Sequence, residues 1–324
     1  MDKEPVFWII DDEWPEHLIE IQALRKAYPN CKIHESGIPF HQDLDAFSAE
    51  TDIIIAQISA HINAAIIDRL SNCRGIAVFG SGFDNIDVSA ANRRGISVTN
   101  VNGYCTQDIA DYVLSAIFHV YKPIYRFSSC ISGGQWGAQA FEQLVHRLDR
   151  QTLLLLGFGH IGSVTAARAT ALDMEVLVYD PYLSPEDIRR SGAVPVSLEA
   201  GLARADFVSV HIRPTAQTIN FVDIDLLRQM KKTAVLINTS RGSLVCEADL
   251  IHAVEAGIIG GAVLDVTSQE PLPPDSPLLQ TKNILVTPHI SFASQESITE
   301  LRQRAVQNAL EMYRGEIPQD LIRI

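Results

Sequence analysis

The sequence has little positive charge, few cysteines and no long apolar run. Its 324 residues include 26 lysines and arginines but 39 aspartates and glutamates, which gives a formal net charge of -13. Without a basic patch or tail, binding to nucleic acid or to an anionic membrane surface is not expected. No apolar stretch approaches the roughly 18 residues that a membrane helix needs. These shortages still allow an anionic small substrate, which needs only one or two local cations.

The cysteines are too few and too scattered for a disulfide framework or a zinc site. Their number is odd and their spacing does not match metal ligands: Cys31, Cys73, Cys105, Cys130 and Cys246. This usage is typical of free thiols in a reducing compartment. The opening stretch MDKEPVFWIIDDEW lacks the apolar core and cleavage site of a signal peptide. We therefore expect a cytoplasmic protein with no bound metal.

Two series of short apolar runs alternate with segments of helical periodicity. The expected strands are 6–10, 52–56, 75–80 and 96–101, followed by 152–157, 175–180, 207–212, 234–239, 261–266 and 284–289. The runs are apolar on both faces, as strands of a helix-covered parallel sheet must be. Strand–helix alternation predicts an α/β, doubly wound architecture, and the chain length predicts about two domains.

Two long helical segments stand where the chain should cross between domains. In the first, 106–127, we expect Thr106 to cap a helix. In the second, 291–315, Ile298, Leu301, Ala305 and Leu310 should face inward, and Gly315 should end the helix. The late helix can return to the first domain. We expect an outer domain of 1–103 plus 290–324, and a nucleotide domain of 104–289.

The strongest local motif is GFGHIG, which follows an apolar strand and opens an alanine-rich helix. Gly157, Gly159 and Gly162 permit a tight turn, close approach of the backbone to a pyrophosphate, and packing of helix on strand. The helix amino end offers N–H groups to the phosphates. Asp180 closes the next strand, where a carboxylate accepts hydrogen bonds from ribose hydroxyls and repels a 2′-phosphate. The motif predicts NAD rather than NADP.

Four polar residues follow later strands of the same series: Arg241, Asp265, Glu270 and His289. Ligands of such sheets lie at the carboxyl ends of the strands, where these residues should gather. Hydride transfer to a 2-keto acid would need a proton donor, for which His289 is suited, with Glu270 to orient it. Arg241 could hold a substrate carboxylate or polarise its carbonyl. Taken singly, a packed histidine, a solvated glutamate and an arginine at a helix end remain alternatives.

Several stretches together resemble the D-isomer-specific 2-hydroxyacid dehydrogenase family over nearly the whole chain. They are GSGFDNIDVSAANRRGISVTNV, ISGGQW, GFGHIG, INTSRGSLV, GAVLDVTSQEPLP and TPHIS. The resemblance implies a Rossmann NAD-binding domain inserted in a flavodoxin-like substrate domain. It implies interconversion of a 2-keto acid and a D-2-hydroxy acid. It also implies a homodimer joined through the nucleotide domain.

The resemblance also assigns site residues. Catalysis falls on Arg241, Glu270 and His289, and substrate binding falls on Gly80, Ser81, Gly82, Arg241 and His289. In this assignment Asp265 binds the nicotinamide carboxamide. The full expected cofactor set is Ser81, Thr106, Gly157, Gly159, His160, Ile161, Gly162, Asp180, His211, Ile212, Thr239, Ser240, Arg241, Asp265 and His289.

Two residues depart from the family pattern, and other functions on the same scaffold remain open. His160 stands where arginine is commoner, and Arg213 stands where proline is commoner. An NAD(H)-sensing corepressor-like protein, a 3-phosphoglycerate dehydrogenase and a phosphite dehydrogenase share the scaffold. The retained arginine, glutamate and histidine favour an enzyme, and Glu270 argues against formate as substrate. The stretch GIAVF before Gly80 offers no arginine for a phosphate.

Overall fold

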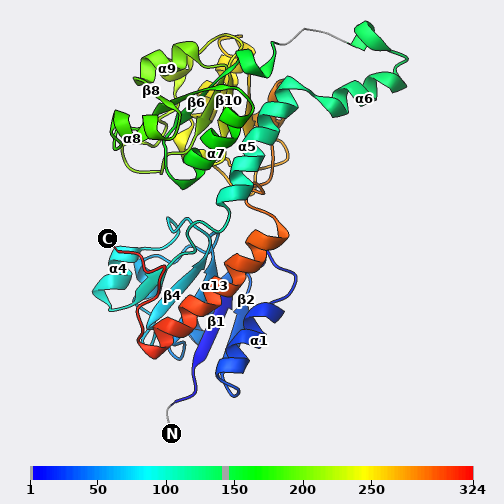
Figure 1. The fold of residues 1–324 in the computed structure, drawn as a ribbon. Coiled ribbons are helices and arrows are strands. Elements are labelled where there is room, and N and C mark those ends of the chain that lie inside the picture. Colours follow the sequence, from blue (N-terminus) through cyan, green and yellow to red (C-terminus); the bar gives the residue numbers. More distant parts are fainter. Residues whose placement is uncertain (1–2, 141–145, 324) are drawn as a thin grey trace. The chain divides into compact units, whose positions relative to one another are not determined.

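The computed structural model describes residues 3–140 and 146–323, which form two compact units (Figure 1). One unit joins the chain up to Tyr104 with the chain from Ser294 onward, and the other spans Cys105–Ala293. These boundaries lie one and four residues later than the sequence predicts. Ile290 and Ser291 stay with the second unit because their backbone N–H groups donate to the carboxylate of Asp265.

The first unit contains a five-stranded parallel sheet in the order β2-β1-β3-β4-β5. This is the flavodoxin-like order that the resemblance implies. The strands are β1 (Val6–Ile10), β2 (Lys32–Ser36), β3 (Ile53–Gln57), β4 (Gly75–Phe79) and β5 (Ser97–Thr99). The sequence does not predict β2, because KIHES is a largely polar edge strand.

Helices cover both faces of this sheet. They are α1 (Leu18–Ala27), α2 (Leu44–Phe47), α3 (Ala64–Ile67), α4 (Val88–Arg93) and α13 (Gln295–Arg314), with a 3-10 turn η1 at Phe40–Asp43. Alternate residues of β1 enter different apolar clusters, with Trp8 in the cluster that contains Ile66 and Phe7 in the cluster that contains Leu301. This alternation is the pattern of a strand that is buried on two sides.

The carboxyl-terminal helix α13 belongs to the first unit, where it lies beside α1 (Figure 1). Ser294 and Ser297 form a capping box at its start, and Gly315 ends it with φ 74°. Of the four residues expected to face inward, Leu301, Ala305 and Leu310 are buried, whereas Ile298 is only half-buried.

The second unit contains a seven-stranded parallel sheet in the order β12-β11-β10-β9-β6-β7-β8. The six strands that come first along the chain, β6 to β11, are arranged in the order of a Rossmann fold. The strands are β6 (Thr152–Leu156), β7 (Glu175–Tyr179), β8 (Val194–Pro195), β9 (Phe207–Val210), β10 (Val235–Asn238), β11 (Gly261–Leu264) and β12 (Ile284–Val286). The α/β prediction with two parallel sheets is confirmed.

The helices of the second unit pack around this sheet, with one exception. They are α5 (Thr106–Tyr121), α6 (Ile124–Ser132), α7 (His160–Ala171), α8 (Pro185–Arg190), α9 (Leu198–Arg204), α10 (Ile224–Leu227), α11 (Glu247–Glu255) and α12 (Pro277–Gln280), with 3-10 turns η2 (Gly137–Ala140), η3 (Leu148–Arg150) and η4 (Gly242–Leu244). The exception is α6, which projects from the rest of its unit (Figure 1) and has no buried residue.

The start of α5 differs from the sequence prediction. Thr106 is the first residue of the helix rather than its cap, and the N-cap residue Cys105 makes no side-chain capping hydrogen bond. The helix is therefore held by packing, with Ile109, Val113 and Ile117 buried. Among the described residues, no helix is long and apolar enough to cross a membrane.

Candidate active site

Most of the expected cofactor and catalytic residues of the second unit follow its strands at one edge of the sheet, whereas Thr106 begins α5 and residues 160–162 begin α7. Because all its strands are parallel, the loops that follow them emerge at the same carboxyl edge. Asp180 follows β7, His211 follows β9, Arg241 follows β10, Asp265 follows β11 and His289 follows β12. The edge therefore brings together the residues that the sequence placed at separate strand ends.

The turn after β6 is built so tightly that only glycine fits at two positions. Gly157 has φ 96°, and a Cβ there would lie 2.8 Å from the carbonyl oxygen of His211. A Cβ at Gly162 would lie 2.7 Å from the carbonyl oxygen of Gly157, so α7 packs directly against the turn. At Gly159, by contrast, an added Cβ would meet open space. A ligand can therefore approach the backbone closely at Gly159.

The start of α7 is suited to an anion. Its N-cap residue, Gly159, provides no side-chain hydrogen bond. The first N–H groups of an α-helix have no partner within the helix, and the helix dipole gives them partial positive charge. A pyrophosphate placed over Gly159 would meet these groups at His160 and Ile161.

Asp180 is tied to the same turn. Its Oδ2 accepts a hydrogen bond from the N–H of Phe158 at 2.8 Å, and its Oδ1 accepts one from the N–H of Tyr182 at 2.9 Å. Each carboxylate oxygen can accept a further hydrogen bond, which leaves room for two ribose hydroxyls. Directly after β10, the hydroxyl of Thr239 is buried without a hydrogen-bond partner in the part of the chain that the structure describes. An unsatisfied group of this kind fits a site that is completed by a bound cofactor.

His289 and Glu270 form a close pair. Nδ1 of His289 lies 2.7 Å from Oε2 of Glu270, and Oε1 of the glutamate accepts the N–H of Thr267 at 2.9 Å. Burial disfavours the Glu270 carboxylate, but the hydrogen bond and charge of His289, the N–H of Thr267 and the charge of Arg241 together outweigh burial, so the pKa of Glu270 lies below its ordinary value. Nε2 of His289 has no partner among the described residues, and a quarter of the side chain is exposed. This nitrogen is free to meet a substrate.

Asp265 fixes the turn that carries His289. Its buried carboxylate accepts hydrogen bonds from the hydroxyl of Thr287 at 2.6 Å and from the N–H groups of Ile290 and Ser291 at 2.9 and 2.8 Å. His289 itself has φ 53°, a conformation that non-glycine residues rarely adopt. The sequence gives Asp265 only a role with the cofactor and misses this one. The only sequence signal for a structural role of Asp265 was the polar residue Thr287, two residues before His289 in VTPHIS.

Arg241 lies in a loop that is fixed through its backbone. The amide of Asn238 donates to the carbonyl of Arg241 at 2.8 Å, and a guanidinium nitrogen of Arg241 donates to the carbonyl of Ser240 at 2.9 Å. A Cβ at the next residue, Gly242, would lie 1.9 Å from the carbonyl carbon of Thr267. The loop of Arg241 is therefore in direct backbone contact with the loop that leads to Glu270.

The expected substrate loop, Gly80–Gly82, lies in the first unit at the end of β4. The N–H of Gly80 is already used, since it donates to the carbonyl of Val78 at 3.0 Å. Asn100 donates to the carbonyl of Ser81 at 2.6 Å and so fixes the loop. Within the described ranges, the N–H groups of Ser81 and Gly82 have no acceptor, so two backbone donors remain for an anion.

Metal chemistry finds no support in the described part of the chain. No group of three or more histidine, cysteine or acidic side chains there could hold a metal ion. None of the five cysteines forms a disulfide bond.

Comparisons with known proteins show the family to which the chain is similar. Residues 114–291 match the family model described as the NAD binding domain of D-isomer specific 2-hydroxyacid dehydrogenases. The chain is 34% identical to a glyoxylate reductase of Korarchaeum cryptofilum over 84% of its length and 83% of the relative. It is 33% identical to a glyoxylate reductase of Thermofilum pendens over 93% of its length and 90% of the relative.

A solved structure of a Thermus thermophilus protein superposes with a TM-score of 0.85 at 31% identity, covering 98% of this chain and all of the other. The family model covers more than half of the chain, and both glyoxylate reductases align with most of it. The chain therefore belongs to the D-isomer specific 2-hydroxyacid dehydrogenase family and is an NAD-dependent oxidoreductase that interconverts 2-keto acids and 2-hydroxy acids.

Proposed function

We propose that His289 and Glu270 are the acid–base pair of this dehydrogenase and that Arg241 binds its substrate. The observation that carries the proposal is the 2.7 Å contact between Nδ1 of His289 and Glu270, which leaves Nε2 open. Bound NADH supplies the hydride. His289 donates a proton from Nε2 to the carbonyl oxygen in reduction and accepts it in the reverse direction. The Glu270 carboxylate fixes the ring orientation and stabilises the imidazolium.

Binding of the substrate carboxylate is assigned to backbone and arginine donors. The N–H groups of Ser81 and Gly82 have no acceptor among the described residues, as an anion-binding loop requires. The guanidinium of Arg241 is planar and presents several donors, which suits a carboxylate or a polarised carbonyl. We therefore assign the first unit to substrate binding and the second to NAD binding.

Asp180 supports a preference for NAD over NADP. Its carboxylate is fixed beside the glycine turn by the N–H groups of Phe158 and Tyr182. A 2′-phosphate on the adenosine ribose would be placed against this negative charge, whereas two hydroxyls would donate to it. A purely NAD(H)-sensing role is the weaker alternative for a separate reason, because sensing needs neither His289 nor Glu270.

An NADH-oxidation screen tests the proposed function. Glyoxylate, hydroxypyruvate, pyruvate and bulkier 2-keto acids are offered in turn, and the loss of NADH absorbance is followed. We expect oxidation with at least one of them, and kcat/KM with NADPH about tenfold or more lower, which corresponds to about 1.4 kcal/mol of repulsion. If no keto acid is reduced with either cofactor, the residue assignments are wrong. Equal rates with NADPH would contradict the role of Asp180 alone.

A homodimer is the assembly that we propose, with a second copy covering α6 and the residues after it. Ile124, Tyr125, Ile131 and Trp136 are 77, 84, 58 and 77% exposed. Monomeric proteins seldom expose several large apolar side chains together.

The five cysteines, none of them in a disulfide, support the proposed cytoplasmic location.

Placing a charge in this apolar surface should dissociate the dimer. We expect Ile131→Lys to shift the mass in light scattering from two chains toward one, because the lysine would lose hydration in the interface. Ile317→Lys is the matched control, since Ile317 is 75% exposed in the first unit. A wild-type protein that already has the mass of one chain would overturn the proposal.

A further inference from the structure

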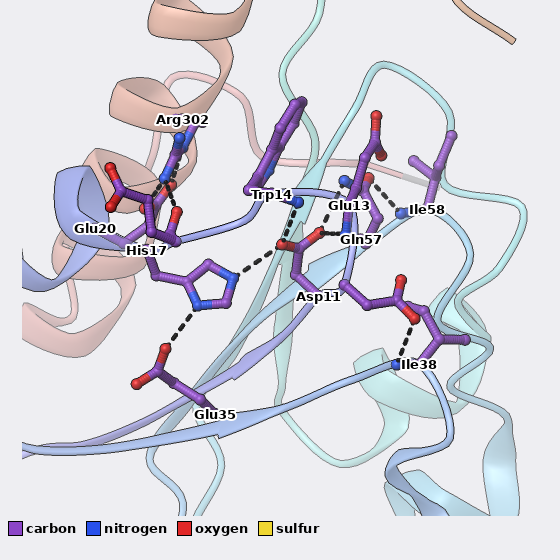
Figure 2. Close-up of polar contacts among 12 residues, drawn as sticks. Asp11, Glu13, Trp14, His17, Glu20, Glu35, Ile38, Gln57, Ile58 and Arg302 are labelled. Carbon is purple, nitrogen blue, oxygen red and sulfur yellow. Dashed lines mark hydrogen bonds and ion pairs between the residues drawn. The ribbon is translucent and has the colours of Figure 1, made fainter.

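A buried polar cluster stands at the carboxyl edge of the sheet in the first unit, where β1 and β3 are neighbours (Figure 2). Asp11 follows β1 directly, and Gln57 is the last residue of β3. Asp11, His17 and Gln57 are 4, 9 and 3% exposed. In a sheet of this order, the edge between β1 and β3 is the topological switch point, where ligands are usually bound.

His17 is held between two carboxylates. Its Nε2 lies 2.9 Å from Oδ2 of Asp11 and its Nδ1 lies 2.7 Å from Oε2 of Glu35, as Figure 2 shows. Both nitrogens must donate, so the ring is an imidazolium. The hydrogen bond to Asp11, against the effect of burial and with help from Glu35, raises the pKa of His17 to about 9. The pair Arg302–Glu20 lies beside this group, with Nη2 of Arg302 also donating to the carbonyl of Glu16.

Asp11 connects His17 to the end of β3 through hydrogen bonds. Its Oδ1 accepts a hydrogen bond from the side-chain amide of Gln57 at 3.2 Å, and the amide oxygen of Gln57 accepts the N–H of Ile58 at 2.9 Å. The side chain of Asn85 donates to the carbonyls of Gln57 and Ala60 at 3.2 and 2.8 Å. The loop that follows Gly82 is thus tied to the end of β3 as well.

The substrate loop rests on the residue that this relay positions. A Cβ at Gly80 would lie 2.4 Å from Cγ2 of Ile58, so the backbone of Gly80 is packed against that side chain. A shift of Ile58 would therefore move the loop that carries the N–H groups of Ser81 and Gly82. We propose that His17, acting through Asp11 and Gln57, is a positioning residue that sets the affinity of the Gly80–Gly82 loop for the keto acid. The proposal rests on the assignment of this loop to substrate binding.

The relay should weaken in alkali. The folded pKa of His17 lies above its ordinary value of 6.5, so the imidazolium stabilises the cluster fully below that value and is lost as the pH rises through about 9. Once neutral, the ring can donate to only one of Asp11 and Glu35. The KM for the keto acid should then increase above pH 9, while the affinity for NADH, which is bound by the second unit, should not follow it.

The test compares His17→Gln with His34→Gln in steady-state kinetics of the full-length protein at pH 7. His34 is a matched control, because it also bonds a glutamate, Glu50 at 2.7 Å, and stacks on Phe47 in the same unit, with no bond to the relay. Gln57→Met is a second variant that cuts the relay while keeping the charged pair of His17 and Asp11.

We expect His17→Gln and Gln57→Met to raise the keto-acid KM by about tenfold, the effect of about one lost hydrogen bond, and to change kcat and NADH affinity by less than about threefold. His34→Gln should leave all three unchanged. An unchanged KM in Gln57→Met, or an equal rise in His34→Gln, would overturn the inference while the proposed function stands. Absence of keto-acid reduction by the unaltered protein would overturn both. If His17→Gln does not fold, Gln57→Met decides.

Discussion

Replacing His289 with glutamine should lower kcat for keto-acid reduction by about 10²- to 10⁴-fold, the range that a positioned general acid contributes. The carbonyl oxygen needs a proton as it gains negative charge, and Nε2 of His289 is the open nitrogen of the pair with Glu270. Glutamine keeps a similar shape and polarity but transfers no proton at neutral pH. Steady-state NADH oxidation measures the loss.

Glu270→Gln should have a smaller effect on kcat and a distinct effect on its pH dependence. Because the pKa of Glu270 lies below its ordinary value, the group is a carboxylate at neutral pH and loses its charge only as the pH falls through that lowered pKa. Glutamine removes the charge at every pH. The imidazolium is then less stable, so the alkaline limb of kcat/KM for reduction should move to lower pH.

Two comparisons test the roles of His289 and Glu270 together. The double variant should lose little more than His289→Gln alone, because both residues act on the same proton. NADH affinity, measured by fluorescence titration, should change by less than about threefold in each variant. Wild-type turnover by His289→Gln would refute its role as the acid.

Arg241→Lys should lower kcat/KM by about 10²- to 10³-fold although the positive charge is retained. The lysine ammonium is a point charge and cannot reproduce a planar pair of donors. The loop around Arg241 should keep its conformation, because Asn238 holds the carbonyl of residue 241 rather than its side chain. The loss is measured in both KM and kcat for the keto acid.

Arg241→Met separates charge from geometry. If the guanidinium acts chiefly as a bidentate donor, lysine and methionine should be nearly equally poor. If charge alone matters, lysine should retain most of the activity, and the geometric assignment would be wrong. Unaltered thermal unfolding in both variants would show that the losses arise at the site.

The sequence predicts the central strands well because each is a continuous apolar run buried on both sides. Val6–Ile10 and Thr152–Leu156 are buried at every position. β2 and β8 escape prediction because edge strands have no such requirement: KIHES is mostly polar, and β8 has two residues.

For the site, the residue types could be predicted but not their contacts. Spacing after the strands places Arg241, Asp265, Glu270 and His289 at one edge, because parallel strands end there together. The bonds of Asp265 to the turn of His289 depend on how two loops meet, which no local pattern encodes. The relay from His17 was missed for the same reason, since its members come from the segment between β1 and α1, from β2 and from β3.

The absence of a side chain at Gly242 has a consequence for how this site tolerates change. An added Cβ would lie less than 2 Å from the carbonyl carbon of Thr267, so the backbones of the Arg241 loop and of the loop that leads to Glu270 are in direct contact. Neither the arginine nor the glutamate can then be adjusted alone, because a displacement of one strand end is transmitted to the other. The proposed substrate-binding arginine and the proposed acid–base pair are therefore mechanically coupled, so a change in either loop has to be matched in the other.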